Sequence, residues 1–309
     1  MSHDKFRLIT RSDFDGLVCA VLLKELDLLD GIQFVHPKDM QDGKVAVTNR
    51  DITTNLPYVE GVHLAFDHHH SEMFRVGKHD NLIINPDAPS AARVVYDHYG
   101  GKEKFPNVSD DLMDAVDQGD AAEFSEEEVL DPERWALLNF LMDARTGLGR
   151  FRNFRISNYD LMMQLIDFCR THTIEQILEL PDVKERVDLY FEHEYLAKEQ
   201  LKECSTVHQN LVVLDLREEE TIFATNRFTI YALFPQTNIS IHVLWGKQKQ
   251  NTVFAIGKSI INRGSHTDVG KLCLDYGGGG HTAAGTCQVE TERAEAVLAE
   301  LIAKITADG

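Results

Sequence analysis

The residues best suited to chemistry in this chain form a short polar run, Asp67-His68-His69, directly after the apolar stretch Val62–Phe66. That stretch predicts a buried strand, so the run falls at its carboxyl end, where ligands bind in open α/β sheets. A carboxylate beside an imidazole can hold a divalent cation. We expect His68 to be a metal ligand, His69 to face a substrate and Asp67 to orient the site or join it as a ligand.

A second polar cluster follows another predicted strand, Phe6–Thr10. Asp13 and Asp15 lie two residues apart, and Gly16 permits a tight turn into the next helix. Carboxylates suit Mg²⁺ or Mn²⁺, and an added imidazole favours Mn²⁺ or a similar transition metal. Asp before Gly is also ordinary turn chemistry. The position between a strand and an apolar helix favours the metal, and the two clusters together predict one metal centre.

Further carboxylates are candidates for the same centre. Asp51 follows the predicted strand Val45–Thr48, and a parallel sheet would bring it to the shared carboxyl edge. Asp117 and Asp120 lie at the end of an apolar helical stretch, where both are also plausible as simple helix-terminus residues. Asp120 is the better candidate, although spacing alone does not decide between them.

A glycine run near the C-terminus is the second strong feature. Gly277–Gly280 and His281 precede Thr282–Gly285, which we predict to be helical. Glycines before a helix let backbone N–H groups approach an anion closely, and His281 adds a side-chain donor. Upstream, Arg263 adds positive charge. A flexible spacer is the alternative, but apolar segments flank the run directly, so we expect an anion-binding loop.

The elements that must position these residues form two patterns. The first half alternates strands with helices and predicts a doubly wound parallel sheet. Residues 110–209 are almost wholly helical, and strand signals return from Leu211. The predicted strands are Phe6–Thr10, Ile32–His36, Val45–Thr48, Val62–Phe66, Leu82–Asn85, Leu211–Leu216, Thr229–Phe234, Ile239–Leu244 and Thr252–Lys258, and the predicted helices include Leu17–Leu29, Ala91–Tyr99 and Glu292–Ile305. We therefore expect an α/β domain with a helical linker over residues 1–205 and a smaller α/β domain over residues 206–309.

Composition limits the function classes. The 309 residues are 43% hydrophobic, and no apolar run approaches the roughly 20 residues that span a bilayer. The start of the chain lacks the pattern of a signal peptide, and five scattered cysteines fit a reducing cytosol. A net charge of −19 disfavours long nucleic acid as a partner. We expect a cytoplasmic protein with no membrane partner, and a homodimer stays open.

Together these motifs resemble the DHH–DHHA1 phosphoesterase family, in order and over essentially the whole chain. The matching residues are Asp13-Phe14-Asp15-Gly16, Asp51, Asp67-His68-His69, Asp120 and Gly278-Gly279-Gly280-His281. The resemblance implies a doubly wound catalytic domain, a linker helix and a smaller substrate-binding domain. It also implies hydrolysis of phosphodiester or phosphoanhydride bonds, usually with Mn²⁺.

One residue departs from the family pattern. Many relatives carry a metal-binding histidine two residues before the first Asp or slightly further upstream, and this chain has Arg11 there. A guanidinium has no lone pair for a cation. Whether the centre holds one ion or two is therefore open. Arg11 is expected either to neutralise carboxylates or to bind a substrate phosphate.

The expected function is metal-assisted hydrolysis of short oligonucleotides or small nucleotide phosphates. The alternatives are an exopolyphosphatase or pyrophosphatase and a nucleotide-phosphate binding protein with weakened catalysis. The expected metal ligands, for Mn²⁺ or Mg²⁺, are Asp13, Asp15, Asp51, His68 and Asp120; the expected catalytic residues are Asp67, His69 and Arg11; and the expected substrate-binding residues are Gly278, Gly279, Gly280, His281 and Arg263.

Overall fold

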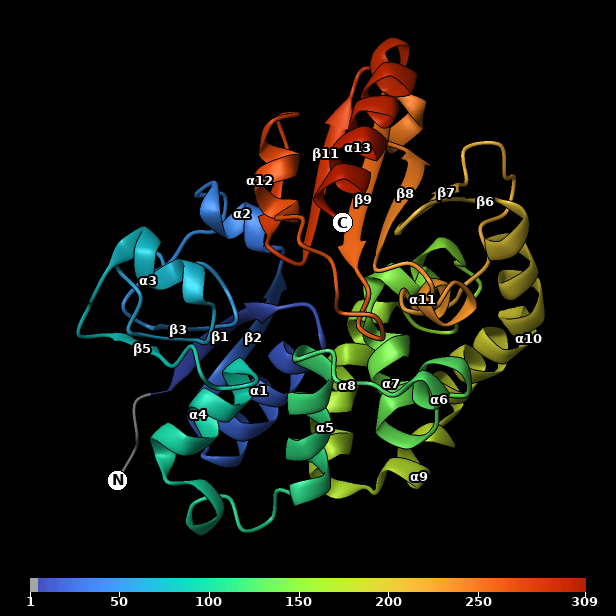
Figure 1. Ribbon diagram of the computed structural model, residues 1–309. Coiled ribbons are helices and arrows are strands. Elements are labelled where there is room, and N and C mark those ends of the chain that lie inside the picture. The colour runs from blue at the N-terminus through green and yellow to red at the C-terminus, as the bar shows by residue number, and fades with distance from the viewer. Residues whose placement is uncertain (1–4) are drawn as a thin grey trace. The chain divides into compact units, whose positions relative to one another are not determined.

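The computed structural model describes residues 5–309, which divide into two compact units (Figure 1). The first unit runs to Phe124 and also contains Pro132–Asp188. The second contains Ser125–Asp131 and Leu189–Gly309. This division falls inside helix α10 (Pro181–Glu203), and the boundary after residue 205 stays a prediction.

The first unit is built on a parallel sheet. Its strands are β1 (Phe6–Arg11), β2 (Leu29–Val35), β3 (Asp51–Thr54), β4 (Leu64–Asp67) and β5 (Leu82–Ile84). Their spatial order is β2-β1-β3-β4-β5, and every neighbouring pair is parallel. The strand order reverses between β1 and β3, and ligands bind beside the carboxyl ends of the strands at such a switch point. The predicted doubly wound parallel sheet is confirmed.

Apolar side chains cover both faces of this sheet. Helices α1 (Phe14–Glu25) and α4 (Ala91–Tyr99) pack together on one face. Helix α2 (Pro37–Gln41) contributes Met40 to a cluster on the other face with Ile9. Helix α3 (His70–Val76) contributes partly buried Val76 to a neighbouring cluster. Because the sheet is covered on both faces, its strand ends are left to carry polar groups.

Two predicted strands are wrong. The segment Val45–Thr48 forms no strand, and the third strand is instead Asp51–Thr54, a buried, β-branched run. Val45 and Val47 pack from a loop against the core. The segment predicted over Thr229–Phe234 is helix α11 (Thr229–Leu233), in which the hydroxyl of Tyr231 donates to the carbonyl of Gly257 at 2.7 Å.

The stretch of sequence between the last strand of the first sheet and the first strand of the second is mostly helical, as predicted. Its helices are α5 (Asp110–Asp120), α6 (Glu126–Leu130), α7 (Arg134–Met142), α8 (Asn158–Thr171), α9 (Ile174–Leu178) and α10, with short 3₁₀ turns η2 (Ala144–Thr146) and η3 (Leu148–Arg150). Ser109 caps α5 by accepting a hydrogen bond from the backbone N–H of Leu112 at 3.1 Å. This cap fixes the helix whose other end, at Asp120, carries a candidate ligand.

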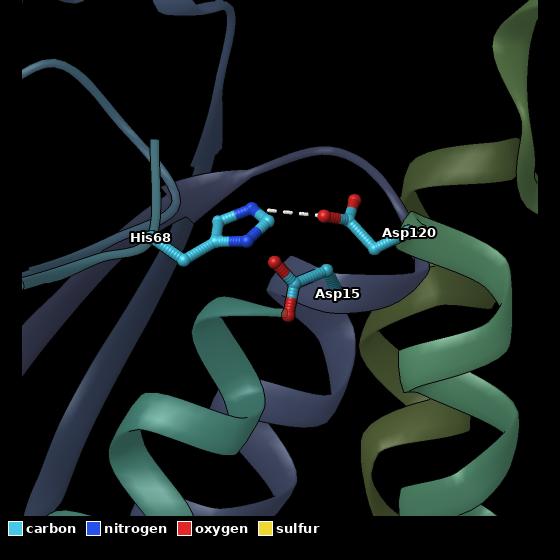
Figure 2. A group of neighbouring side chains, drawn as sticks. All are labelled: Asp15, His68 and Asp120. Carbon is cyan, nitrogen blue, oxygen red and sulfur yellow. Dashed lines mark ion pairs between the residues drawn. The ribbon is translucent and has the colours of Figure 1, made fainter. Parts of the chain in front are cut away.

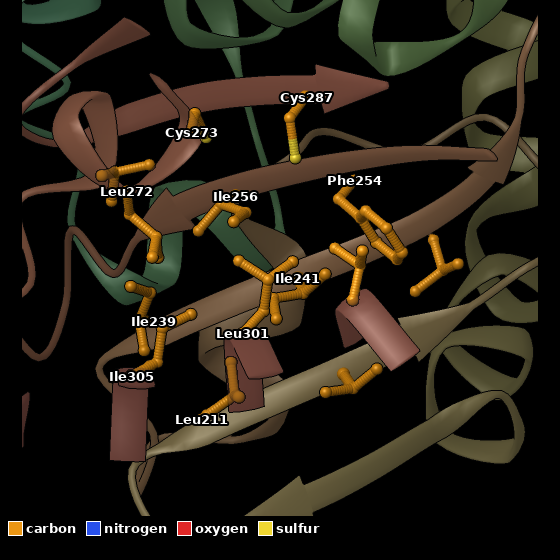
Figure 3. Close-up of a cluster of buried hydrophobic side chains, with 14 of the residues drawn as sticks. Leu211, Ile239, Ile241, Phe254, Ile256, Leu272, Cys273, Cys287, Leu301 and Ile305 are labelled. Carbon is orange, nitrogen blue, oxygen red and sulfur yellow. The ribbon is translucent and has the colours of Figure 1, made fainter. Parts of the chain in front are cut away.

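The second unit contains a mixed sheet. Its strands are β6 (Ser205–His208), β7 (Leu211–Asp215), β8 (Ile239–Trp245), β9 (Thr252–Lys258), β10 (Gly279–His281) and β11 (Ala284–Val289). Their order is β10-β11-β9-β8-β7-β6, and within this sheet of the described residues only β7 and β8 pair in parallel. Helices α12 (Val269–Leu274) and α13 (Ala294–Asp308) cover one face, where Ile241, Phe254 and Leu301 are fully buried (Figure 3). Within residues 5–309 no helix has the length and apolar character needed to cross a bilayer.

Candidate metal centre

Ligand atoms from separate segments of the first unit converge at the carboxyl edge of its sheet. Asp15, His68 and Asp120 each place one ligand atom within 4.8 Å of the others (Figure 2). Among residues 5–309, these three side chains are the acidic, histidine or cysteine residues whose ligand atoms come close enough together to hold one ion. Asp15 comes from the first turn of α1, His68 follows β4 and Asp120 ends α5.

Asp15 is held by the start of another helix. Its carboxylate accepts hydrogen bonds from the backbone N–H groups of Ala91 at 3.0 Å and Ala92 at 2.7 Å, in the first turn of α4. Ser90 caps that helix. Burial raises the pKa of Asp15 well above its usual value, and the charges of Asp120 and Asp13 add to the effect. A divalent cation would relieve this repulsion between neighbouring carboxylates.

His68 has the ring orientation of a metal ligand. Its Nδ1 lies 3.1 Å from the carbonyl oxygen of Ala88, so in the neutral ring Nδ1 carries the proton and the lone pair is on Nε2. Nε2 lies 2.9 Å from Oδ2 of Asp120, a close ion pair whose alignment falls short of a hydrogen bond. Such geometry is expected of two ligands directed at a common point rather than at each other.

Asp13, two residues after the end of β1, is another carboxylate at this edge, and its charge is neutralised by an arginine. Asp13 caps α1, accepts from the backbone N–H of Gly16 at 2.9 Å and pairs with Nε of Arg11 at 2.8 Å. Burial raises the pKa of Asp13, while the charge of Arg11 opposes that rise. The side-chain amide of Asn55 also donates to Asp13, at 3.2 Å. The two roles expected for Arg11 are to neutralise carboxylates or to bind a substrate phosphate, and in the structure its guanidinium pairs with the carboxylate of Asp13.

Asp67 and His69 form a separate pair. Nδ1 of His69 lies 2.7 Å from Oδ1 of Asp67, which is buried at the end of β4. The carboxylate therefore orients the imidazole and leaves Nε2 for another partner. The rings of His68 and His69 are 4.6 Å apart, so His69 is beside the ligand group without belonging to it.

The expected position of Asp51 is wrong. Asp51 is the first residue of β3 and pairs in register with Arg7, at the amino edge of the sheet. Its carboxylate accepts from Nε of Arg7 at 2.7 Å and from the backbone N–H of Thr48 at 2.6 Å. The residue that β3 delivers to the carboxyl edge is Asn55, which the sequence reasoning missed. The signal was the run Ile52-Thr53-Thr54, a better strand than Val45–Thr48.

The glycine run has a different structure from the one expected. Gly279–His281 form edge strand β10 of a hairpin, and no helix follows, because Ala284–Val289 form β11. A Cβ on Gly278 would lie 2.1 Å from the carbonyl oxygen of Thr286, so close backbone packing requires that glycine. A Cβ on Gly279 would meet nothing within 4 Å. Packing within the chain therefore does not explain Gly279.

Arg263 lies in the exposed loop between β9 and α12. Its Nε donates to the carbonyl oxygen of Ile260 at 3.1 Å, which holds the side chain against its own loop. His281 is exposed at the end of β10. Both residues belong to the second unit, and their substrate-binding roles stay predictions.

The donors at the first unit's centre fit a divalent cation. Two carboxylates and one imidazole suit Mn²⁺, and also Mg²⁺ when water completes the shell. Oδ2 of Asp67 and Oδ1 of Asn55 are buried and have no hydrogen-bond partner among residues 5–309. Unpaired buried oxygens are costly in a structural core and ordinary beside a hydrated ion.

We expect the metal-free protein to lose stability as the pH rises from about 6.5 to 9. Burial lowers the pKa of His68, but contact with Asp120 and the charge of Asp15 outweigh it and raise the pKa to about 9. A group whose pKa is raised by folding stabilises the folded state fully at pH values below its ordinary pKa, here 6.5. That stabilisation is lost as the pH rises through the raised pKa, here about 9. Thermal unfolding of EDTA-treated protein across this range should show the decline. The variant His68→Asn should show a smaller decline, and equal slopes would contradict the assignment.

The chain is similar to a protein of known structure along its whole length. No protein-family model and no curated protein matches the chain. Among solved structures, the pGpG-specific phosphodiesterase PggH from Vibrio cholerae is 65% identical, with a TM-score of 0.86, over 99% of this chain and 100% of that one.

Two distant structures share the fold alone. RecJ from Thermus thermophilus, solved in complex with Mn²⁺, is 13% identical with a TM-score of 0.50, over 98% of this chain and 52% of RecJ. CDC45 from Entamoeba histolytica is 9% identical with a TM-score of 0.50, over 98% of this chain and 95% of that one. Since PggH is similar along its whole length, the chain belongs to the family that its motifs predicted, the DHH–DHHA1 phosphoesterases.

Proposed function

We propose that this chain is a metal-dependent phosphodiesterase that hydrolyses the linear dinucleotide pGpG to two molecules of GMP. The observation that carries the proposal is the 65% identity to a pGpG-specific phosphodiesterase over both whole chains. The convergence of Asp15, His68 and Asp120 supports it, because phosphodiester hydrolysis commonly uses a metal-bound water. Imidazole among the ligands favours Mn²⁺ over Mg²⁺.

The residues of the centre divide the work of the reaction. Asp15, His68 and Asp120 would hold the cation, which when bound lowers the pKa of a coordinated water and so supplies hydroxide. Arg11 places a guanidinium at the same edge, where its remaining N–H groups can donate to a phosphate oxygen. His69, oriented by Asp67, would hold a proton at Nε2 for the leaving ribose oxygen.

The glycine hairpin of the second unit is the proposed contact for the substrate. Gly279 has room for a Cβ and yet carries none, which is what close approach of a ligand to the backbone requires. His281 at the end of β10 and Arg263 in the preceding loop would add donors for phosphate.

Replacing Gly279 with leucine is expected to raise KM for the dinucleotide by about 10-fold or more. A Cβ there has nothing within 4 Å, so we expect the melting temperature to change little. The effect on KM corresponds to about 1.4 kcal/mol of lost binding. Steady-state kinetics and thermal unfolding measure both quantities. Gly149→Leu is the control for glycine loss, because Gly149 is exposed in η3 and a Cβ there would make only an ordinary contact with Asn158, at 3.8 Å. An unchanged KM in Gly279→Leu would remove the assignment.

A hydrolysis panel tests the function. The EDTA-treated protein is assayed with Mn²⁺, with Mg²⁺ and without metal on pGpG, longer RNA, cyclic di-GMP, pyrophosphate and polyphosphate. The expected result is GMP from pGpG, fastest with Mn²⁺, and little product from the others. Orthophosphate from pyrophosphate or polyphosphate would favour the phosphoanhydride alternative. No product with any substrate and metal would favour a binding protein.

The cellular location is a separate proposal. The cysteines are free, and three of them, Cys19, Cys273 and Cys287, are buried in the described structure. Free cysteines fit a reducing compartment, so we place the enzyme in the cytoplasm.

A further inference from the structure

Asp13 differs from the other carboxylates of the centre because one of its oxygens is paired with a guanidinium. Oδ2 pairs with Nε of Arg11 at 2.8 Å. Oδ1 accepts from the backbone N–H of Gly16 at 2.9 Å and from the side-chain amide of Asn55 at 3.2 Å. A cation bound at Asp13 would have to displace a guanidinium and lie against two N–H donors, and both contacts oppose a positive ion.

Asn55 is a neutral residue at a position where an acid would attract a further ion. It follows β3, beside β1 at the switch point, and is only 1% exposed. Its φ is +53°, a left-handed conformation that asparagine tolerates better than most residues. Its backbone N–H donates to the carbonyl of Phe66 at 3.1 Å. The amide group is thus held in place with its NH₂ directed at Asp13.

The other carboxylates leave little for a second ion. Asp67 gives Oδ1 to His69, and although its Oδ2 has no hydrogen-bond partner among residues 5–309, Asp67 lies outside the group of converging ligand atoms. Asp15 and Asp120 belong to that group with His68. The carboxylates at this edge, with Asp67 included, carry four negative charges. One divalent cation and the guanidinium of Arg11 supply three positive charges, whereas two divalent cations and Arg11 would supply five, which exceeds the negative charge.

We propose that the centre holds one divalent cation and that Arg11 supplies, beside Asp13, the positive charge that a second cation supplies in two-metal hydrolases. The inference deepens the proposed function, because it rests on the same centre. In two-metal sites the ions together stabilise the attacking and leaving oxygens. Here the fork of N–H groups on Arg11, fixed by Asp13, would bind a phosphate oxygen on the side away from the ion.

Metal stoichiometry tests the proposal without substrate. Isothermal titration of the EDTA-treated full chain with Mn²⁺ should give one ion per chain. Its low-temperature electron paramagnetic resonance spectrum should show the six-line pattern of an isolated Mn²⁺. The double variant Arg11→Gln with Asn55→Asp removes the guanidinium and adds a carboxylate. It should bind two ions per chain and show the spectrum of a coupled pair.

The chain offers a matched control on the same strand. Arg7 pairs with Asp51 at 2.7 Å, at the opposite end of β1 from Arg11. Arg7→Gln also frees a carboxylate from an arginine, but it should still bind one ion. Two ions in the wild type would overturn the proposal. One ion in a folded double variant would overturn the assignment of Arg11 and Asn55, and Asn55→Asp alone serves if the double variant does not fold.

Failure of this inference is distinguishable from failure of the proposed function. Two ions bound by a protein that hydrolyses pGpG would reject the single-ion centre and leave the function intact. One ion bound by a protein that does not hydrolyse pGpG would reject the substrate and leave the single-ion centre intact. No bound ion would reject both.

Discussion

Replacing Asp120 with asparagine is expected to lower kcat/KM for pGpG by about 10²-fold or more and to weaken Mn²⁺ binding by a similar factor. Asp120 ends α5 and places Oδ2 2.9 Å from Nε2 of His68. The asparagine has nearly the same shape, so the helix end is preserved while one negative charge at the ion is lost. Kinetics with saturating Mn²⁺ and titration of the metal-free protein give the two values.

Two other aspartates of the same helix provide the comparison. Asp114 is 82% exposed on α5, and Asp114→Asn should leave metal binding unchanged. Asp117 accepts from Arg93 at 2.8 Å and from the hydroxyl of Ser90 at 2.6 Å, so Asp117→Asn should act mainly on stability. Loss of Mn²⁺ binding in Asp117→Asn, with retention in Asp120→Asn, would show that the ligand was assigned to the wrong turn.

Replacing Gly16 with alanine should destabilise the first unit by about 3 kcal/mol and reduce hydrolysis severely. A Cβ at this position would lie 2.0 Å from the backbone oxygen of Arg11 and 2.7 Å from Oγ1 of Thr10. A rigid backbone atom cannot yield as a flexible side chain can. The segment that carries Arg11, Asp13 and Asp15 must therefore move. Chemical denaturation and Mn²⁺ titration measure the two effects.

Gly31→Ala is the matched control for this substitution. Gly31 lies in β2, and a Cβ there would meet only Cγ of Arg7, at 3.8 Å, which is an ordinary contact. That variant should keep its stability within about 0.5 kcal/mol and bind Mn²⁺ normally. A Gly16→Ala protein with wild-type stability and metal affinity would mean that the turn is less constrained than its geometry indicates.

Much of the centre was predictable because strand ends and ligand types coincide. The apolar runs before Asp13 and Asp67 indicated strands, and parallel strands bring their carboxyl ends to one edge. That argument predicted a meeting of Asp15 with His68. Asp120 comes from a helix, and its selection over Asp117 rested on a weak preference. Only the packing of α5 against α1 and α4 shows which of the two aspartates approaches Asp15 and His68.

The third strand shows where sequence reasoning failed. Val45 and Val47 alternate with other residues as strand residues do, but they pack from a loop. Hydrophobic alternation over four residues does not determine which segment receives strand partners. The choice of Val45–Thr48 moved the expected ligand to Asp51, whereas the true strand ends before Asn55.

The glycine run failed for a different reason. Glycines predict close backbone approach, but the sequence does not say whether the approaching group belongs to a ligand or to the chain itself. Gly278 and Gly280 are needed for contact with β11, and Gly270 of α12 packs against the backbone of Gly280. Only the folded structure separates these from Gly279, around which the chain leaves space.

The hydrogen bonds that the start of α4 donates to Asp15 have a consequence for how the sequence can vary. The groups that orient its carboxylate are the main-chain amides of Ala91 and Ala92, which every residue except proline possesses. Homologues can therefore exchange these alanines for other small residues, and their alignments would give no sign that the two positions orient a carboxylate. What natural selection must preserve is the residue at which the helix starts, and Ser90 sets it.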